Sequence, residues 1–258
     1  MANPVSYIGK QTVGFVTGLG HITFFGLDIV RNFFRGPLRI RRTIDAIYDL
    51  GVLSVVLIAT SGFAVGAVLG LQGYTTLVRF GAEQSLGAVV GLSLIRELGP
   101  VLTGLLVTGR AGSSVAAEIG TMVATEQLDG LRMMSVNPMH FVVLPKALAM
   151  TFVMPLLSAI FTICAIFGGY AVGVELLGLD GGTYLGSLES SVDFREDVVG
   201  SMLKAWVFGA IVGLISTYRG YMSDPNAAGV SRATTSTVVI ASVTILFSDY
   251  FITALWGV

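Results

Sequence analysis

Five long stretches of this chain are almost free of charged side chains, and they constrain the fold more than any other feature. They lie at about residues 50–73, 85–112, 147–174, 198–218 and 233–256. A hydrocarbon core of about 30 Å needs roughly 20 helical residues, and each stretch is long enough. Only a helix or a closed barrel satisfies its backbone groups in lipid. The pattern predicts an all-α integral membrane protein with five transmembrane helices.

Composition agrees with a membrane protein. Of the 258 residues, 53% are hydrophobic and 12% are charged, whereas an ordinary soluble domain has roughly 25% charged residues. The formal net charge of −1 offers no basic excess for a polyanion, so no nucleic-acid partner is expected. The single cysteine, Cys164, lies in an apolar run and is interpreted as a buried thiol. No metal site is expected.

The second stretch and the N-terminal arm depart from the simple pattern. Arg96 and Glu97 interrupt the second stretch, and Pro100 removes a helical hydrogen bond, so a kinked or broken helix is expected there. Residues 5–34 are apolar but contain several polar groups. For them, a helix lying on the cytoplasmic surface fits better than a sixth span. Its expected anchors are Phe24, Phe25, Phe33 and Phe34.

Basic side chains gather beside the spans on one side of the membrane. They are Arg31, Arg35, Arg39, Arg41, Arg42, Arg110, Arg132, Lys146, Arg219 and Arg232. The connection 175–197 is acidic instead. The positive-inside rule therefore predicts a cytoplasmic N-terminus, a cytoplasmic connection at 113–146 and a periplasmic C-terminus. We expect an N-terminal interfacial region at 1–45 and a transmembrane domain at 46–258.

The long cytoplasmic connection is amphipathic and predicts a helix over about 118–136, which Asn137-Pro138 ends. Ala124, Leu128, Leu131 and Met134 share one side, and Glu126, Asp129 and Arg132 share the other. Such a helix either floats at the interface or docks into a groove on a soluble partner. The pattern alone leaves both open.

Glycines spaced four residues apart form ridges on two spans. Gly62, Gly66 and Gly70 lie on the first span, and Gly209 and Gly213 on the fourth. Small residues at this spacing let helix backbones approach closely. The ridges pack either within one chain or between two copies related by a twofold axis.

The segment IRELGPVLTGLLVTGRAGSSVAAEIGTMVATEQLDGLRMMSVNP resembles the signature region of MlaE-type permeases. These are membrane subunits of ABC transporters that move phospholipids in Gram-negative envelopes. The signature pieces LRELGPV, GRAGS, AAEIG, ATEQL and a following D/NP all occur, with Ile95 in place of the first Leu. The resemblance extends to 54–74, 192–209 and 227–239, and so covers the chain from about residue 35 onward.

This resemblance implies a non-catalytic permease in a Gram-negative inner membrane. It implies that 118–136 is the coupling helix for an ABC ATPase subunit, with contacts from Glu118, Glu126, Leu128, Asp129, Leu131 and Arg132. Glu118 is expected either to contact that ATPase or to pair with Arg110. The other implied partners are phospholipid, a periplasmic ring of MCE-domain subunits and a small cytoplasmic STAS-domain subunit. Because ABC ATPases work in pairs, a homodimer of this chain is expected.

ATP chemistry is absent from the chain itself. A P-loop needs G-x-x-x-x-G-K-[ST], and the nearest sequence, residues 104–111, lies in a span and ends in Arg-Ala. No cofactor is therefore expected, and ATP is expected to bind the partner subunit only.

Four ionisable side chains interrupt the predicted spans: Arg96, Glu97, Lys204 and Asp249. Each costs about 2.5–3.5 kcal/mol to insert and is a functional candidate. At 1.5 Å per residue, Lys204 and Asp249 lie roughly 10–13 Å below the outer boundary, and the other two a little deeper. They either form ion pairs that orient the helices or line an outward-facing cavity for a lipid head group. A candidate wall for the acyl tails is formed by Leu69, Leu77 and Phe80.

Other functional classes remain alternatives. An ion- or proton-coupled secondary transporter would also bury charges, but such folds usually contain inverted repeats, which the sequence lacks. An intramembrane hydrolase needs a serine with a positioned histidine, and His21 and His140 lie away from the buried charges. A structural anchor for a periplasmic lipid-binding complex would tolerate neutralised charges at Lys204 and Asp249.

Overall fold

The computed structural model describes residues 4–35 and 39–256, and all regular secondary structure in them is helical. Five helical runs are long and apolar enough to cross a membrane: Ile40–Phe80, Glu83–Ala124, Met139–Leu176, Phe194–Tyr221 and Ala227–Leu255. The all-α membrane fold with five spans is thereby confirmed. The runs extend past most of the predicted limits because helical structure continues into the polar segments that flank the apolar stretches.

Most of these runs combine α-helices with wider or tighter turns. The first contains α2 (Ile40–Ile47), the π-helical turn η1 (Tyr48–Val52), α3 (Leu53–Leu77) and the 3₁₀ turn η2 (Val78–Phe80). The second contains the 3₁₀ turn η3 (Glu83–Ser85), α4 (Leu86–Ser93), the π-helical turn η4 (Leu94–Leu98), α5 (Gly99–Val107), the π-helical turn η5 (Thr108–Gly112) and α6 (Ser113–Ala124). The third contains the π-helical turn η6 (Met139–Val143), α8 (Leu144–Tyr170) and the π-helical turn η7 (Ala171–Leu176). The fourth contains the π-helical turn η8 (Phe194–Val198) and α10 (Val199–Tyr221), and the fifth lies within α11 (Ala227–Trp256).

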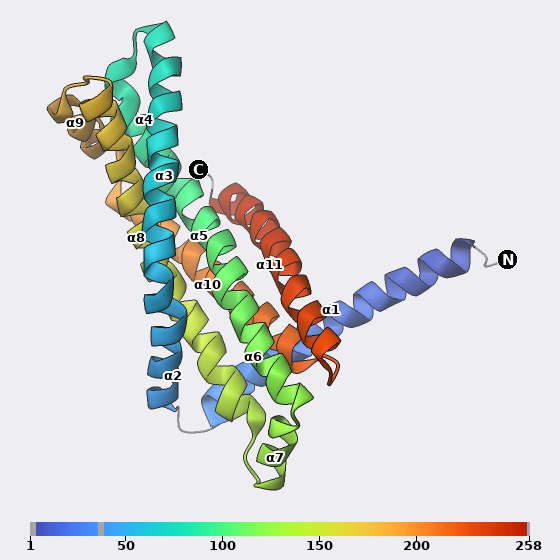
Figure 1. Ribbon diagram of the computed structural model, residues 1–258. Helices are drawn as coiled ribbons and strands as arrows, with labels where there is room; N and C mark the ends of the chain where they lie inside the picture. The colour runs from blue at the N-terminus through green and yellow to red at the C-terminus, as the bar shows by residue number, and fades with distance from the viewer. Residues whose placement is uncertain (1–3, 36–38, 257–258) are drawn as a thin grey trace.

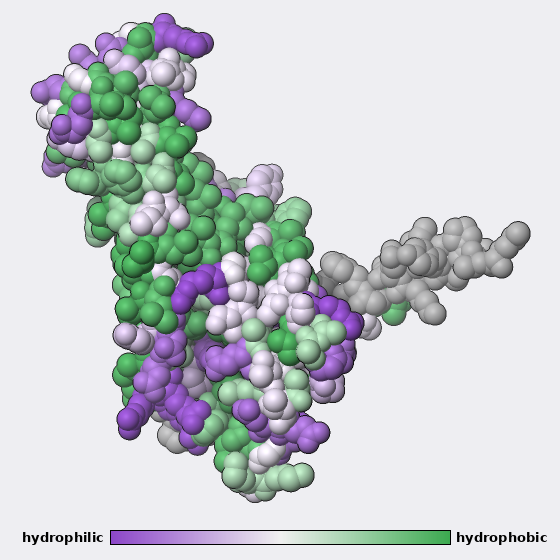
Figure 2. All heavy atoms as spheres, in the orientation of Figure 1, coloured by the Kyte–Doolittle hydropathy of each residue, from purple (hydrophilic) through white to green (hydrophobic). Residues whose placement is uncertain are grey.

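Helix α8 is the central element of the bundle and packs against both α3 and α10, while α10 also contacts α6 and α11. Figure 1 shows that α4 and α9 (Gly181–Ser191) form one end of the molecule and that α7 (Gln127–Met133) forms the opposite end. We call these the α9 end and the α7 end. Hydrophobic side chains cover the middle of the visible face, and hydrophilic ones gather toward both ends (Figure 2). This distribution is the one expected of a helical bundle in a bilayer.

Helix α9 is a short helix outside the five spans. The backbone amide of Thr183 donates to the carboxylate of Asp180, 2.7 Å away, which caps the helix and lowers the pKa of Asp180. On its inner side, Tyr184 packs edge-on against Tyr170, and burial raises the pKa of Tyr184 to about 12. The α9 end is therefore a packed part of the fold.

The connection between the second and third spans differs from the single helix expected over 118–136. Helix α6 continues the second span to Ala124, and α7 then covers only Gln127–Met133. The break occurs because Glu126 adopts a left-handed conformation, with φ of 57°. Ser135 is also left-handed, with φ of 59°, so α7 ends before Asn137-Pro138.

Helix α1 (Pro4–Arg35) crosses the α7 end of the bundle, and its N-terminal part extends away from it (Figure 1). It is not among the five candidate spans found in the described residues. Phe24 and Phe34 are exposed, as membrane anchors would be. The prediction for Phe25 is wrong, because its ring is buried against Tyr218 and Tyr221, with centroids 5.4 and 5.6 Å away.

The glycine ridges pack within the chain, which settles the alternative that the sequence leaves open. A methyl group on Gly62 or Gly66 would meet the backbone of Phe161 or Ala165 in α8. Gly70 faces Gly169 in the same way. Because α3 and α8 touch through their backbones, any side chain larger than hydrogen forces the two helices apart.

The second ridge uses the opposite part of α8. A methyl group on Gly209 would lie 2.9 Å from the carbonyl oxygen of Met150, and one on Gly213 would lie 2.9 Å from that of Ala147. Close contact on both sides makes α8 the element that fixes α3 and α10 relative to each other.

We predict that Gly66→Ala lowers the free energy of unfolding by at least about 1–3 kcal/mol, the usual cost of overpacking a core, because α8 backbone occupies the space. Gly186→Ala in α9 is the matched control, since nothing lies within 4 Å of its added methyl group. The measurement is thermal unfolding of both variants in detergent. Equal transition temperatures for the two variants would contradict the close approach of α3 and α8.

Candidate functional site

Lys204 lies at the centre of a charged cluster between three spans. Its ammonium group donates to Glu97 Oε1 at 2.9 Å and to Thr253 Oγ1 at 2.8 Å. The carboxylate of Asp249 lies 3.7 Å from the same nitrogen. Lys204 is buried, and a buried ammonium group is tolerated only when charged and hydrogen-bonding partners surround it. The cluster therefore ties α10 to η4 and to α11.

Pro100 explains the remaining bond of Lys204. In a regular helix the carbonyl of Arg96 would accept from the amide of residue 100, but proline has no N–H. That carbonyl instead accepts a hydrogen bond from Lys204 at 3.0 Å. The expected irregularity of the second span takes the form of the π-helical turn η4, directly before α5. The local defect in the helix thus creates part of the site.

Arg96 forms a second ion pair at the edge of the cluster. Its Nε donates to Asp197 Oδ1 at 2.5 Å, and the other carboxylate oxygen of Asp197 accepts from the backbone amide of Asp193 at 2.8 Å. Asp197 is buried, while about a third of the Arg96 side chain is exposed. Because η8 holds Asp197, the start of the fourth span fixes the position of Arg96.

The sequence predicts the four charged residues of the cluster but not Asp197 or Thr253. Asp197 belongs to the acidic connection 175–197, where nothing separates a buried carboxylate from exposed ones. Thr253 follows Asp249 by four residues, one helical turn, and this spacing was the available signal. The four predicted charges are close together in the structure.

A narrow recess of about 20 Å³ is lined by Arg96, Glu97, Lys204 and Thr253 of the cluster, but not by Asp249, and is bordered also by Glu196, Asp197, Ser201 and Ile252. Such a volume holds about one water molecule, so the cluster is closed in this conformation. The Glu97 side chain is 39% exposed and lies at the opening. One carboxylate oxygen of Asp249 is buried without a hydrogen bond from any described residue. This oxygen, Oδ1, is the one that lies 3.7 Å from the Lys204 ammonium group, so Asp249 is held by charge and not by a hydrogen bond.

The proposed acyl-tail residues lie elsewhere on the first span. Leu69 and Leu77 pack against the main hydrophobic core, whereas Phe80 in η2 is 79% exposed. None of the three borders the recess beside the cluster. Their proposed role as a wall for lipid tails remains a prediction.

The α7 end holds the predicted coupling residues. Leu128 is buried and Leu131 partly buried against the core, as predicted for one side of the helix. Met134 was expected on that side but is 67% exposed, because α7 ends at Met133. Met133 and Met134 together form an exposed apolar tip. Glu126 is exposed at the break before α7.

The polar side chains near α7 hold it against the spans. Arg132 donates to Asp129 at 2.7 Å and to the Tyr221 hydroxyl at 2.6 Å. Glu118 accepts from Lys146 at 2.5 Å, so the alternative that it pairs with Arg110 is wrong. Arg110 is oriented by the first span instead, where it donates to Ser54 Oγ at 2.6 Å and to two carbonyls of η1. A movement of α7 would therefore be transmitted to α10 through the Arg132–Tyr221 hydrogen bond and to α6 through the direct contact between the two helices.

Comparisons with known proteins cover the whole of this architecture. A family model described as Permease MlaE matches residues 43–255. A probable ABC transporter permease protein of Rickettsia bellii is 44% identical over 99% of this chain and 98% of its own length. The intermembrane phospholipid transport system permease protein MlaE of Haemophilus influenzae is 43% identical over the same shares. The chloroplastic protein TRIGALACTOSYLDIACYLGLYCEROL 1 of Arabidopsis thaliana is 31% identical over 88% of this chain and 65% of its own length.

We predict that Lys204→Met lowers the free energy of unfolding by about 3–5 kcal/mol, because it leaves two carboxylates without a cation in a buried site. Glu97→Gln should lower the free energy of unfolding by less, because Lys204 still contacts Asp249, Thr253 and the Arg96 carbonyl. Thermal unfolding in detergent measures both. Arg79→Met, at an exposed arginine in η2, is the control; a Lys204→Met protein as stable as this control would argue against a stabilising role for the cluster.

Proposed function

The chain belongs to the MlaE permease family, and from this premise we propose that it is the membrane subunit that moves phospholipid between the inner membrane and a periplasmic lipid-shuttling system. Energy comes from ATP hydrolysis in a separate subunit. The observation that carries the proposal is the charged cluster around Lys204, which joins three spans, in a chain 43% identical to a phospholipid transport permease.

The orientation follows from the distribution of basic residues. Lys146, Arg132, Arg219 and the arginines before the first span all belong to the α7 end, so this end faces the cytoplasm. The N-terminus is then cytoplasmic, the C-terminus periplasmic, and the cluster lies in the outer half of a Gram-negative inner membrane. Lipid leaving the cluster reaches the periplasmic side.

A phospholipid head group matches the charges of the cluster. Arg96 is the exposed cation at the edge, and its planar guanidinium suits a phosphate. Glu97 and Asp249 suit the ammonium group of a zwitterionic lipid, which would replace Lys204 as the cation beside Asp249 Oδ1. Because the recess is too small for a head group in this conformation, binding requires that α10 and α11 separate from η4.

Exchange of ion pairs provides the two states that transport needs. Lys204 is 2.9 Å from Glu97 and 3.7 Å from Asp249, so a small shift changes its preferred partner. In the closed state the ion pairs replace the lipid, which favours its release. In the open state the head group takes over the contacts that Lys204 gives up. Leu69, Leu77 and Phe80 serve as the wall for the tails.

The exposed tip of α7 is the proposed contact with the ATPase. Met133 and Met134 are 89% and 67% exposed, and together they form an apolar tip that a partner can cover. Glu118, Glu126 and Asp129 supply polar contacts around it, while Leu128, Leu131 and Arg132 hold α7 to the spans. Closure of the ATPase pair would move α7 and, through α6 and α10, squeeze the cluster.

The assembly requires two copies of this chain. Each chain offers one α7 to a paired ATPase, and α11 presents a row of exposed apolar side chains that a second copy can cover: Leu246, Phe247, Tyr250 and Phe251. A periplasmic ring of MCE-domain subunits receives the lipid, and a small STAS-domain subunit binds on the cytoplasmic side. No cofactor binds to the permease itself.

The proposal predicts that proteoliposomes containing the assembled transporter move fluorescent phospholipid to an acceptor only when ATP is present. Lys204→Gln should slow this movement at least about tenfold, because it removes one ion-paired state. Trp206→Ala, at an exposed position on the same helix, should leave it near the wild-type rate. Movement driven by a proton gradient without ATP would identify a secondary transporter. Wild-type movement in Lys204→Gln would support a structural anchor.

We also predict that Met133→Asp reduces copurification of the ATPase with the chain, because it places a charge in an apolar contact. Because the side chain is exposed, the substitution should leave membrane insertion unaffected. Thr75→Asp, on an exposed surface near the α9 end, is the control. Undiminished recovery of ATPase with Met133→Asp would rule out the tip of α7 as the docking contact.

A further inference from the structure

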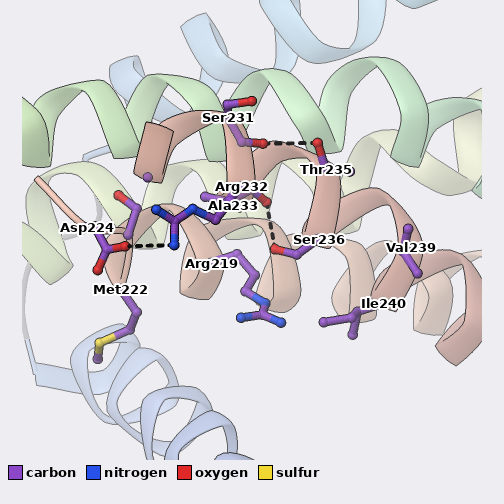
Figure 3. A pocket seen from close by; sticks show the side chains of 12 residues that line it. Arg219, Met222, Asp224, Ser231, Arg232, Ala233, Thr235, Ser236, Val239 and Ile240 are labelled. Atoms are coloured by element: carbon purple, nitrogen blue, oxygen red, sulfur yellow. Dashed lines mark hydrogen bonds and ion pairs between the residues drawn. The ribbon is translucent and has the colours of Figure 1, made fainter. Parts of the chain in front are cut away.

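A second recess, unrelated to the charged cluster, lies at the α7 end between the last turns of α10 and the first turns of α11. Its volume is about 620 Å³. Figure 3 shows the side chains of Arg219 and Met222 on one side of it and those of Arg232, Ser236 and Ile240 on α11. Arg219 lies about four helical turns from Lys204 along α10, so the two recesses are separate.

The recess has an unbalanced positive charge. Arg232 lies 3.6 Å from the carboxylate of Asp224, and both side chains are largely exposed. Arg219 also lines the recess, but no acidic side chain in the described part of the chain pairs with it. Figure 3 shows its guanidinium free of the Arg232–Asp224 pair. A half-buried guanidinium with open donors is the type of group that binds a phosphate through two parallel hydrogen bonds.

The lining changes from polar to apolar along α11. Arg232 and Ser236 lie in its first turns, and Val239 and Ile240 follow within one turn. The exposed apolar surface then continues through Val243, 47% exposed, toward the middle of the span. A ligand that fits this change from polar to apolar lining has an anionic group at the membrane boundary and a hydrocarbon chain directed into the bilayer. A soluble phosphate would contact only the polar part of the lining.

From this arrangement we infer that the recess binds an anionic phospholipid of the adjacent leaflet, with its phosphate at Arg219 and an acyl chain along Val239 and Val243. Basic recesses between membrane helices on the cytoplasmic side suit anionic head groups, because basic residues near the membrane surface attract them. Asp224 neutralises Arg232 and thereby limits the affinity. The inference holds whatever cargo the Lys204 cluster carries.

The test uses the purified full-length chain, in detergent and without an ATPase, titrated with phosphatidylglycerol or with phosphatidylcholine and analysed by native mass spectrometry. Wild-type protein should bind phosphatidylglycerol in preference. Arg219→Gln should weaken that binding about tenfold, equivalent to about 1.4 kcal/mol for one lost charged contact. Arg219→Lys should retain only part of the phosphatidylglycerol binding, because lysine keeps the positive charge but lacks the planar guanidinium that donates two parallel hydrogen bonds. Asp224→Asn should strengthen it by releasing Arg232.

Arg79→Gln, which removes an exposed arginine at the α9 end, is the matched control and should bind as wild type. Thermal unfolding of each variant separates a lost site from a lost fold. The inference is overturned if Arg219→Gln, still folded, keeps wild-type phosphatidylglycerol binding. It is also overturned if inorganic phosphate displaces the lipid, since the recess would then be a site for a soluble anion. A substitution that changes only the dimer content would likewise overturn it, since the recess would then be part of the contact with a second copy.

Discussion

The exclusion of unpaired charge from the bilayer is the constraint on which this structure depends. Lys204 can be buried only because Glu97, Asp249, Thr253 and the carbonyl freed by Pro100 surround it. These partners come from three spans, so the helices cannot rearrange without exchanging the contacts of the ammonium group. The same cluster is therefore a structural tie and the proposed site at which a polar head group competes.

The glycine contacts complement this tie. Gly62, Gly66 and Gly70 press α3 against α8, and Gly209 and Gly213 do the same for α10. Lipid offers no hydrophobic force between helices, so this close van der Waals packing holds α3, α8 and α10 as one body. Helix α11 is much less buried than these helices. A movement that opens the cluster is therefore more readily made at α11 than at α3 or α8.

The sequence predicted what depends on local composition and missed what depends on tertiary contacts. The number of spans and the four charged residues inside them follow from apolar length and from the cost of charge in lipid. The helix break at Glu126 could not be predicted in this way, because a left-handed residue in an amphipathic run has no compositional signal. Phe25 packs on Tyr218 and Asp197 pairs with Arg96 for reasons that only the folded neighbours reveal. The pairing of Glu118 with Lys146 likewise depends on how the second and third spans meet.

The central claim is that a phospholipid head group enters the recess around Lys204. The most direct measurement places a photoreactive amino acid at Ser201, which borders that recess, and another at Trp206, on the exposed surface of α10. After illumination in native membranes, mass spectrometry identifies the crosslinked species. Phospholipid crosslinks are expected at Ser201, and ATP turnover by the assembled transporter should diminish them while crosslinks at Trp206 stay unaffected. Crosslinks at Ser201 that contain no lipid, or that ignore ATP turnover, would contradict it.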